Sequence, residues 1–433
     1  MASTPMKIRN LQRKLYRVSK QNEDYRFYSL YDKVYRMDIL REAYKRCKAN
    51  RGAPGVDGVT FQDIERSGLE AFLADIADTL HTRNYAPMPI RRVMIPKPDG
   101  RQRPLGIAPI RDRIVQAACK IVMEPIFEPH LHESSFGYRP RKRAQDAIRE
   151  IEEGIKAGYV HVYDADLSGY FDSIPHDRMM EKLARRISDK QILALIRKML
   201  KAPVQTTDPN GRRHYTASTC GVPQGNVLSP LMANVYLNDF CLTIANSTPC
   251  KIISYADDFV ILHKQPYTRE QLDWFEMRLQ REELTVNHKK TRVVDMRKIG
   301  ADLDFLGFNL QKVRGFYRNT IYVKIQPSKK SQKKFKDAIR QIVKHRTSRT
   351  LDELIAKVNP IIRGWHNYFG KIGYPRKVFF KMDWFTVGRF YRWSKRLSQR
   401  RCKRLTQDAW RVLRLRGLIY LQPVRFSPVK GTR

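Results

Sequence analysis

The four residues Tyr255-Ala256-Asp257-Asp258 lie between two short apolar runs, Lys251-Ile252-Ile253-Ser254 and Phe259-Val260-Ile261-Leu262. Both runs have the composition of β-strands, so the pattern predicts a hairpin with two adjacent carboxylates at its tip. Adjacent carboxylates repel each other and pack poorly, and binding of a hard divalent cation such as Mg²⁺ is the usual compensation. Taken alone, an Asp-Asp pair is more often a solvated turn. The rest of the chain decides between the two interpretations.

The composition indicates a folded protein with a polyanionic partner. The 433 residues include 83 Lys and Arg against 43 Asp and Glu, a formal charge of +40, and 42% of the residues are hydrophobic. A chain of this size and apolar content can bury large cores and should form two to three domains. Each Lys or Arg that neutralises a phosphate releases a condensed counterion, so the charge favours nucleic acid as the partner.

Membrane and disulfide-rich classes do not fit the chain. No stretch approaches the roughly 20 apolar residues of a membrane span, and the polar start lacks a signal-peptide core. We therefore expect an intracellular protein with no membrane partner. The six cysteines form no C-x-x-C pair, which predicts free thiols rather than structural zinc.

A second acidic centre precedes the hairpin. Residues 159–167 have the β-branched and aromatic composition of a strand, whose period of two places Asp164 and Asp166 on one face. If this strand ends beside the hairpin tip, carboxylates from both segments could gather around two cations. Asp164 and Asp172 are interpreted as ordinary turn or cap residues.

A polar loop lies between the two acidic centres. Gly221-Val222-Pro223-Gln224-Gly225 leads into Ser229-Pro230, which have the residue types of a helix N-cap and first turn. The pattern predicts that this loop opens a buried helix. Gln224 could hydrogen-bond a nucleotide or nucleic acid, while Gly225 allows close approach of the backbone.

Three motifs follow one another along the chain: Asp166 with Phe171, then Pro223-Gln224-Gly225, then Tyr255–Asp258. In this order they resemble the palm of a reverse transcriptase. Further blocks are similar to the group II intron-encoded type, the intron reverse transcriptase/maturase. These blocks are Asn50–Val59, Ile95–Pro98, Arg103–Ile107, Ser135–Pro140, Phe305–Phe308 and Gly364–Phe369.

The resemblance implies an α+β right-hand polymerase fold, with fingers and palm followed by an α-helical thumb. The expected domains are an N-terminal extension over residues 1–45, reverse transcriptase fingers and palm over 46–325, and a basic, RNA-binding thumb or maturase domain over 326–433. Local patterns predict a hairpin over 91–107 and a helix over 143–157. After residue 325 the apolar spacing is helical. Residues 326–433 hold 29 Lys and Arg against 5 Asp and Glu, so they carry +24 of the total charge.

The resemblance also implies the residues of the active site. Asp166, Asp257 and Asp258 would be catalytic, and with Leu167 they would hold two Mg²⁺ ions, for which Mn²⁺ can substitute. The reaction would be in-line attack of a primer 3′-hydroxyl on a deoxynucleoside triphosphate. Phe171 would exclude the 2′-hydroxyl of a ribonucleotide, with core packing as the alternative role. The implied nucleotide-binding residues are Arg91, Lys97, Arg113, Phe171, Gln224 and Lys290.

The segment 389–404 interleaves cations with the aromatic residues Phe390, Tyr391 and Trp393. This pattern suits phosphate contacts combined with stacking on exposed RNA bases. A solvated basic helix is the alternative, although cations without acidic neighbours repel one another strongly when no polyanion is bound. The expected nucleic-acid-binding residues are Arg389, Arg392, Arg400, Arg401, Lys403 and Arg404.

The expected function is an RNA-directed DNA polymerase that copies RNA into DNA and assists the splicing and mobility of its group II intron RNA. Its partners would be intron RNA, an RNA template/DNA primer duplex, dNTPs and target DNA, and a homodimer is compatible with the sequence. No Cys and His spacing suited to an endonuclease follows the thumb, so the resemblance is to compact forms that lack this domain. The expected location is the cytoplasm of a bacterial type of cell, with nucleoid association as an option.

Two alternatives stay open at this point. The first is a domesticated relative that acts in DNA repair or in antiphage or CRISPR-linked defence without an intron. The second is a non-enzymatic RNA-binding splicing factor with a relict palm. The presence of Asp166, Asp257 and Asp258 argues against the second alternative.

Overall fold

The chain folds into two compact units, each assembled from several segments. The computed structural model describes residues 4–96, 100, 102–208, 210–315, 320–344, 349–373, 375–395 and 408–422. The first unit consists of Met1–Arg143, Ala165–Ile261 and Tyr267–Arg292, and the second consists of Ala144–Asp164, Leu262–Pro266 and Val293–Arg433. Both contain helices and strands, which confirms the α+β class. Among the described helices, none is long and apolar enough to cross a membrane.

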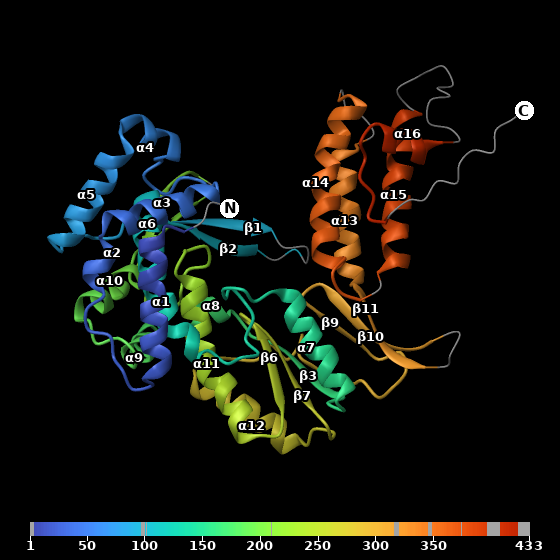
Figure 1. Cartoon of the computed structure of the whole chain (residues 1–433), viewed down its shortest axis with the longest axis horizontal. Coiled ribbons are helices and arrows are strands. Elements are labelled where there is room, and N and C mark those ends of the chain that lie inside the picture. The colour runs from blue at the N-terminus through green and yellow to red at the C-terminus, as the bar shows by residue number, and fades with distance from the viewer. Residues whose placement is uncertain are drawn as a thin grey trace, which may run out of the picture. The chain divides into compact units, whose positions relative to one another are not determined.

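Helix α6 (Ile110–Phe127) forms the centre of the first unit because almost every one of its side chains is buried. Helices α1 (Met6–Gln21) and α3 (Met37–Ala49) pack against it (Figure 1). Helix α3 continues across the expected domain boundary at residue 45. The first residues of the chain therefore belong to the same core as the segments that follow. The remaining helices of this region are α2 (Tyr31–Val34), α4 (Phe61–Ser67) and α5 (Leu69–His81).

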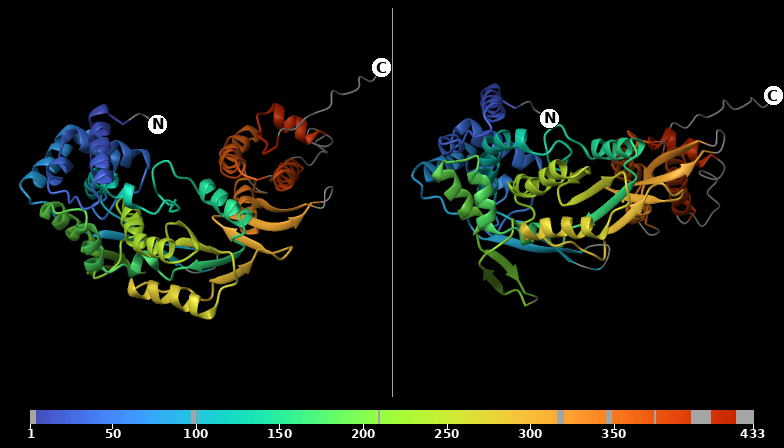
Figure 2. Two further views of the ribbon diagram at one scale, coloured as in Figure 1. Left: turned by 60° about the horizontal axis from the view of Figure 1, so that its bottom comes forward. Right: turned by 90° about the horizontal axis from the view of Figure 1, so that it is seen from below.

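The predicted hairpin over 91–107 is confirmed. Strands β1 (Ile90–Pro96) and β2 (Gln102–Ile107) pair in antiparallel register, with Arg91 opposite Ile107. They belong to a four-stranded sheet of order β2-β1-β4-β5, in which β1 and β4 (Val204–Thr207) run parallel. Strand β5 (Arg213–Thr216) completes a second hairpin with β4, drawn in green in Figure 2.

The acidic hairpin predicted from the sequence is also present. Strand β6 (Lys251–Tyr255) is followed by a two-residue turn and by β7 (Asp258–His263). Ile252, Ile253 and the four residues from Phe259 to Leu262 are at most 1% exposed, so burial of β-branched and aromatic side chains defines both strands. The sheet order is β6-β7-β3-β8, with β3 (His161–Asp166) and β8 (Arg292–Asp295).

Helix α11 (Ser229–Ser247) is the buried helix predicted after the polar loop, but the predicted N-cap is wrong by one residue. Leu228 occupies the N-cap position, and Ser229 is the first helical residue. The Ser229 hydroxyl donates instead to the carbonyl oxygen of Pro223 at 2.8 Å, which closes the loop onto the start of the helix. The other helical segments of this unit are η1 (Glu128–His130), α8 (Tyr170–Ser173), α9 (His176–Ala184), α10 (Lys190–Leu200) and α12 (Arg269–Arg281).

The second unit combines a small sheet with a helical bundle. Strands β9 (Asp302–Phe305), β10 (Phe308–Arg314) and β11 (Ile321–Pro327) form an antiparallel sheet of order β11-β10-β9. The apolar stripes predicted after residue 325 lie on α13 and α14, which pack with each other, and α13 packs on α15 (Figure 1). The helices of this unit are α7 (Ala144–Lys156), α13 (Lys329–Ile342), α14 (Leu351–Phe369), α15 (Arg376–Ser394) and α16 (Ala409–Leu415).

Candidate active site

The acidic hairpin tip is packed against the backbone of a second segment. Ala256 lies in the left-handed region with a φ of +57°, which allows the chain to reverse in two residues. A Cβ placed on Gly137 would overlap the backbone nitrogen of Ala256. Only a glycine at position 137 therefore leaves room for the turn that carries Asp257.

Hydrogen bonds tie this second segment to strand β6. The backbone N–H of Ser254 donates to the carbonyl of Ser134 at 2.9 Å, and the N–H of Phe136 donates to the carbonyl of Ser254 at 2.8 Å. The side-chain amide of Asn234, on α11, donates to the carbonyl of Gly137 at 2.7 Å. The Ser135–Pro140 block of the sequence thus acts as a backbone support for the hairpin.

Asp166 lies at the end of β3, where a turn that follows α12 supplies two donors to its carboxylate. Lys290 Nζ is 2.8 Å from Asp166 Oδ2, and the Asn287 side-chain amide donates to the same oxygen at 3.2 Å. The backbone N–H of Asn287 also donates to the Asp166 carbonyl at 2.7 Å. These contacts determine the position of Asp166 and place a cation beside it.

The carboxylates of Asp166 and Asp257 interact electrostatically. Burial raises the pKa of Asp257 above its ordinary value, and the negative charge of Asp166 raises it further. The cations Arg103 and Lys290 act in the opposite direction and favour the ionised form. Asp258 is the first residue of β7 and is exposed. The site therefore concentrates negative charge that nearby cations only partly offset.

The chemistry of these side chains suits a hard divalent cation. Carboxylate oxygens are the ligands that Mg²⁺ prefers, and Asp166 and Asp257 supply them close to one another. Leu167 is 6% exposed with an apolar side chain, so it could contribute only its carbonyl oxygen. Within the described part of the chain, no group of three or more His, Cys, Asp and Glu side chains is arranged to hold a metal ion. In this arrangement Lys290 and Asn287 occupy one oxygen of Asp166.

The loop that contains Gln224 is joined to strand β2. Arg103 Nε donates to Gln224 Oε1 at 2.6 Å, and the N–H of Gly106 donates to the Gln224 carbonyl at 2.7 Å. Gly225 has a φ of +106°, and a Cβ there would lie 2.5 Å from the carbonyl oxygen of Gly106. Both the positive φ and the lack of space for a Cβ require glycine at position 225. The sequence predicted such a close approach of the backbone.

Phe171 packs beside the same loop. Its carbonyl accepts the N–H of Val222 at 2.6 Å, and its ring makes an edge contact with Tyr170 at a centroid distance of 5.5 Å. The side chain is 5% exposed. The Phe171 side chain is therefore buried between α8 and the loop that contains Val222.

Arg91 and Arg113 both hold the segment that precedes α4. Arg91 Nη2 donates to the carbonyl of Pro54 at 2.8 Å, and Arg113 donates to the carbonyls of Ala53 and Ala108. Arg113 is only 9% exposed, and burial lowers its pKa. Its guanidinium is therefore engaged with backbone oxygens of the protein. Lys97 lies outside the described residues.

The basic and aromatic residues of α15 do not point the same way. Phe390 is fully buried and Trp393 is 5% exposed, so the expectation that they stack on RNA bases is wrong. The reason is that their side of α15 faces the helical bundle. Arg389 is half-buried and donates to the carbonyl of Val343 at 2.8 Å, while Arg392 is exposed. Arg400, Arg401, Lys403 and Arg404 lie outside the described residues.

Several residues of the site were not identified from the sequence. Asn287, Arg103, Asn234 and Gly137 have no motif chemistry of their own, and each acts on a residue far away in the chain. The blocks Arg103–Ile107 and Ser135–Pro140 contain Arg103 and Gly137, but the sequence indicated no role for these two residues.

Comparisons with known proteins agree with this geometry. Residues 95–310 match the family model described as reverse transcriptase (RNA-dependent DNA polymerase), and residues 332–412 match the model described as group II intron, maturase-specific domain. The chain belongs to the group II intron-encoded reverse transcriptase/maturase family. The matched reverse transcriptase segment contains Asp166, Asp257, Asp258 and Lys290.

Individual relatives of this reverse transcriptase family align over part of their length. The chain is 38% identical to "Protein YkfC" of Escherichia coli (strain K12) over 241 residues, which cover 54% of this chain and 62% of that protein. It is 32% identical to "Group II intron-encoded protein LtrA" of Lactococcus lactis subsp. cremoris over 253 residues, 58% of this chain and 38% of LtrA. It is 31% identical to the "Uncharacterized 91 kDa protein in cob intron" of Schizosaccharomyces pombe over 247 residues, 55% of this chain and 29% of that protein. The matches thus cover less than two thirds of each of these relatives.

Proposed function

We propose that the protein is an RNA-directed DNA polymerase that copies RNA into DNA and assists the splicing and mobility of a group II intron RNA. The observation that carries the proposal is the electrostatic interaction of Asp257, at the tip of a hairpin, with Asp166, which lies at the end of a strand and is paired with Lys290. This is the set of charges that a nucleotidyl transfer site needs. It lies within a chain segment that matches the reverse transcriptase model.

In the right-hand description, we assign the sheet β6-β7-β3-β8 to the palm and the hairpin β1–β2 to the fingers. The bundle α13–α15 would be the thumb or maturase domain, because it coincides with the maturase-specific match. Strands place the acidic residues on a rigid support, which suits a site that works by positioning.

The protein residues have distinct roles in this proposal. Two Mg²⁺ ions bound by Asp166 and Asp257, with Asp258 and the carbonyl of Leu167 nearby, would neutralise charge that develops during phosphoryl transfer. Asn287 orients the Asp166 carboxylate. Lys290, freed from Asp166 when the site binds its ligands, would contact the triphosphate of the incoming nucleotide. Arg103 holds Gln224 in place, so that the loop 223–225 presents a constant surface to the nucleotide.

We assign three roles to the other nucleotide-binding residues. Phe171 would lie under the sugar and select deoxyribose. Arg91 and Lys97 would face the triphosphate from the fingers hairpin. Arg113, which is committed to the carbonyls of Ala53 and Ala108, would act by fixing the segment that precedes α4.

The partners follow from the two matched segments. The maturase-specific match supports intron RNA as a ligand, and the reverse transcriptase match supports a template, a primer and dNTPs. Arg392 and the cations from 400 to 404 would contact the RNA phosphates. Activity on intron RNA and target DNA would place the protein in the cytoplasm, with the nucleoid.

Primer extension by Asp257→Asn tests the proposed activity. The variant should fold normally, because it removes a charge whose ionisation is disfavoured by burial. Extension of a DNA primer on an RNA template should nevertheless fall by at least about 10³-fold, since charge neutralisation at the reacting phosphate is lost. Asp78→Asn, an exposed carboxylate on α5, is the matched control and should keep full activity. Full activity of Asp257→Asn would refute the assignment of the site.

A further inference from the structure

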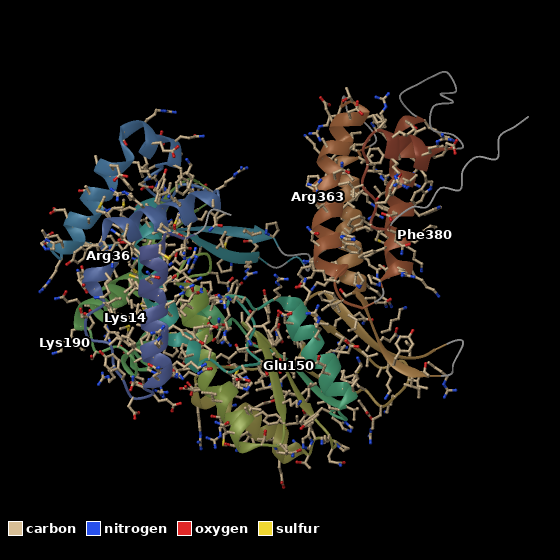
Figure 3. The ribbon with its side chains drawn as sticks, in the orientation of Figure 1. Lys14, Arg36, Glu150, Lys190, Arg363 and Phe380 are labelled. Atoms are coloured by element: carbon tan, nitrogen blue, oxygen red, sulfur yellow. The ribbon has the colours of Figure 1, made fainter. Side chains whose placement is uncertain are left out.

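Two large aromatic side chains of α15 are exposed on the surface of the second unit. Phe380 is 56% exposed and Trp384, one helical turn later, is 65% exposed. With Lys336 of α13, Lys381 and Phe385 they line a hollow of about 360 Å³. We call these five residues the aromatic face, and Figure 3 shows Phe380 on α15.

The helical period explains why this face is not part of the core. Val378, Phe379 and Met382 are at most 7% exposed and form the inward side of α15. Residues at positions 380, 381 and 384 lie on the opposite side of the same helix. Exposed aromatic side chains grouped in one place are a feature of binding surfaces, because it is unfavourable to leave a large apolar ring surface in contact with water.

The Phe380 ring is already ordered by stacking on a neighbouring helix. The Phe380 ring is nearly parallel to that of Trp410 on α16, with an interplanar angle of 10° and a centroid distance of 6.2 Å. Trp410 stacks in turn on Tyr420 at 5.1 Å and 23°. A flat ligand that stacks on Phe380 would meet a side chain that has already lost much of its rotamer freedom.

Cations surround the aromatic rings. Lys336 Nζ and Arg340 Cζ lie over the ring of Phe385, at 5.7 and 5.2 Å from its centroid. Lys381 is exposed within the face. Asp337 is paired with Arg340 at 2.5 Å and offsets one of these charges. The face therefore offers flat apolar rings together with a net positive charge.

We propose that the aromatic face binds an unpaired segment of RNA, with bases stacked on Phe380 and Trp384 and phosphates placed against Lys336 and Lys381. Stacking requires the faces of the bases, which only unpaired nucleotides present, and the cations match the phosphates. The identity of the ligand as RNA rests on the proposed function. The place on the protein where an unpaired segment would bind is inferred from the exposed rings and the charges of α13 and α15.

The test uses the full chain and fluorescence anisotropy. The probes are a labelled, unstructured RNA strand and the same strand annealed to its complement. Phe380→Ala/Trp384→Ala should weaken binding of the single strand by roughly 10- to 100-fold, the effect of losing one or two stacked bases, and binding of the duplex by less than about threefold. Trp384→Phe, made alone in the wild-type chain, keeps an aromatic ring and should retain most of the wild-type affinity for the single strand. Tyr28→Ala removes a side chain that is 72% exposed in the first unit and should change neither affinity.

Several results would overturn the proposal. Unchanged affinity of the double Ala variant for the single strand would show that the rings do not contact RNA. Equal losses on strand and duplex would show that the rings do not act by stacking on unpaired bases. A change in oligomeric state with unchanged RNA affinity, measured by light scattering, would assign the face to a second copy of the chain.

Primer extension separates this inference from the proposed function. At a saturating concentration of a short, pre-annealed template-primer, the double Ala variant should extend the primer at the wild-type rate, because Asp166, Asp257 and Lys290 lie in the first unit and the two changes do not. If the wild-type protein bound single strands through the face but extended no primer, the polymerase assignment would fail and the binding site would stand. Lys336→Gln/Lys381→Gln should lower the affinity and reduce the salt dependence of strand binding by up to about two units, and an unchanged salt slope would count against the phosphate contacts.

Discussion

Asp257 retains a carboxylate where its surroundings disfavour the charge. Burial and the neighbouring Asp166 both raise its pKa, while Arg103 and Lys290 oppose this shift. A residue with such an unfavourable environment is difficult to explain by folding alone, because Asn or a small apolar residue would cost less. The proposed catalytic role would explain why a negative charge is kept at this position with Arg103 and Lys290 close by.

At the same scale, Phe171→Val tests whether this ring selects the sugar. The smaller side chain should raise the incorporation of ribonucleotides relative to deoxyribonucleotides by roughly one to three orders of magnitude, because a steric barrier of about 1.4 to 4 kcal/mol is removed. Phe171 is 5% exposed, so the variant should also lose stability, by about 1 to 3 kcal/mol. Competitive primer extension with both nucleotides, beside thermal unfolding, measures the two effects separately. A loss of stability without any change in sugar preference would leave Phe171 with a packing role only.

The hairpin β6–β7 depends on an element that lies far from it in the sequence. Its turn fits only because residue 137 has no side chain, and its edge strand is paired with Ser134 and Phe136. The acidic tip is therefore positioned by backbone contacts rather than by the carboxylates themselves.

Gly137→Ala should displace the hairpin tip. The added methyl group overlaps the backbone of Ala256, so the turn must move by a fraction of an ångström or more. A displacement of this size at a reacting centre costs about 10²-fold in rate, and primer extension should fall accordingly while RNA affinity is kept. Gly364→Ala is the matched control, because a Cβ at this helical position meets nothing within 4 Å. Full activity of Gly137→Ala would show that the tip tolerates movement.

Helix α15 is tied to the segment that follows α16 through one buried carboxylate. Asp383 is 2% exposed and accepts the backbone N–H groups of Leu421 and Gln422 at 2.9 and 3.0 Å. Burial raises the pKa of Asp383 from 3.8 to about 6 although both hydrogen bonds lower it. The folded protein thus retains a proton between about pH 4 and pH 6 that the unfolded chain has released.

The pH dependence of unfolding should reveal this group. Since the folded state binds more protons in that window, stability falls as the pH rises through it, and the penalty is complete above about pH 6. Between pH 5 and pH 7 the loss due to Asp383 should be roughly 1 kcal/mol. Asp383→Asn should flatten the profile by this amount, whereas Asp352→Asn controls for removal of a surface charge. The measurement is the free energy of unfolding by urea at pH 5, 6 and 7. If this free energy changed with pH equally in wild type and Asp383→Asn, the raised pKa of Asp383 would be contradicted.

At the scale of the whole molecule, the charge of +40 governs association with nucleic acid. Binding of RNA or of a template-primer duplex should weaken steeply as KCl rises, because each neutralised phosphate releases counterions. Replacing Arg400, Arg401, Lys403 and Arg404 with Gln should reduce the slope of log affinity against log salt by up to about four units. Assistance of splicing should suffer more than extension of a short, pre-annealed primer. Equal loss of both activities would indicate that the segment only grips the duplex, and unchanged binding would indicate a solvated basic face.

The local elements and the family could be predicted from the sequence. The strands of the acidic hairpin, the hairpin β1–β2 and the helices after residue 325 follow from local periodicity, and the order of the motifs identified the reverse transcriptase type. These features are short-range, because a helix or a strand depends mainly on residues within a few turns or a few positions of one another. The domain boundary at residue 45 did not coincide with a break in the structure, since α3 crosses it to reach α6.

The amino-acid sequence by itself thus determined the elements and the acidic residues, and only the tertiary structure decided which side chains meet. The partners of Asp166, the support of the hairpin by Gly137 and the bond from Arg103 to Gln224 join residues that are far apart in the chain. The two sides of α15 were decided in the same way. Phe390 and Trp393 became core residues and Phe380 and Trp384 became surface residues, because packing against the bundle determines which stripe of an aromatic-rich helix is buried. A one-dimensional pattern shows that such stripes exist, but the neighbouring helices choose between them.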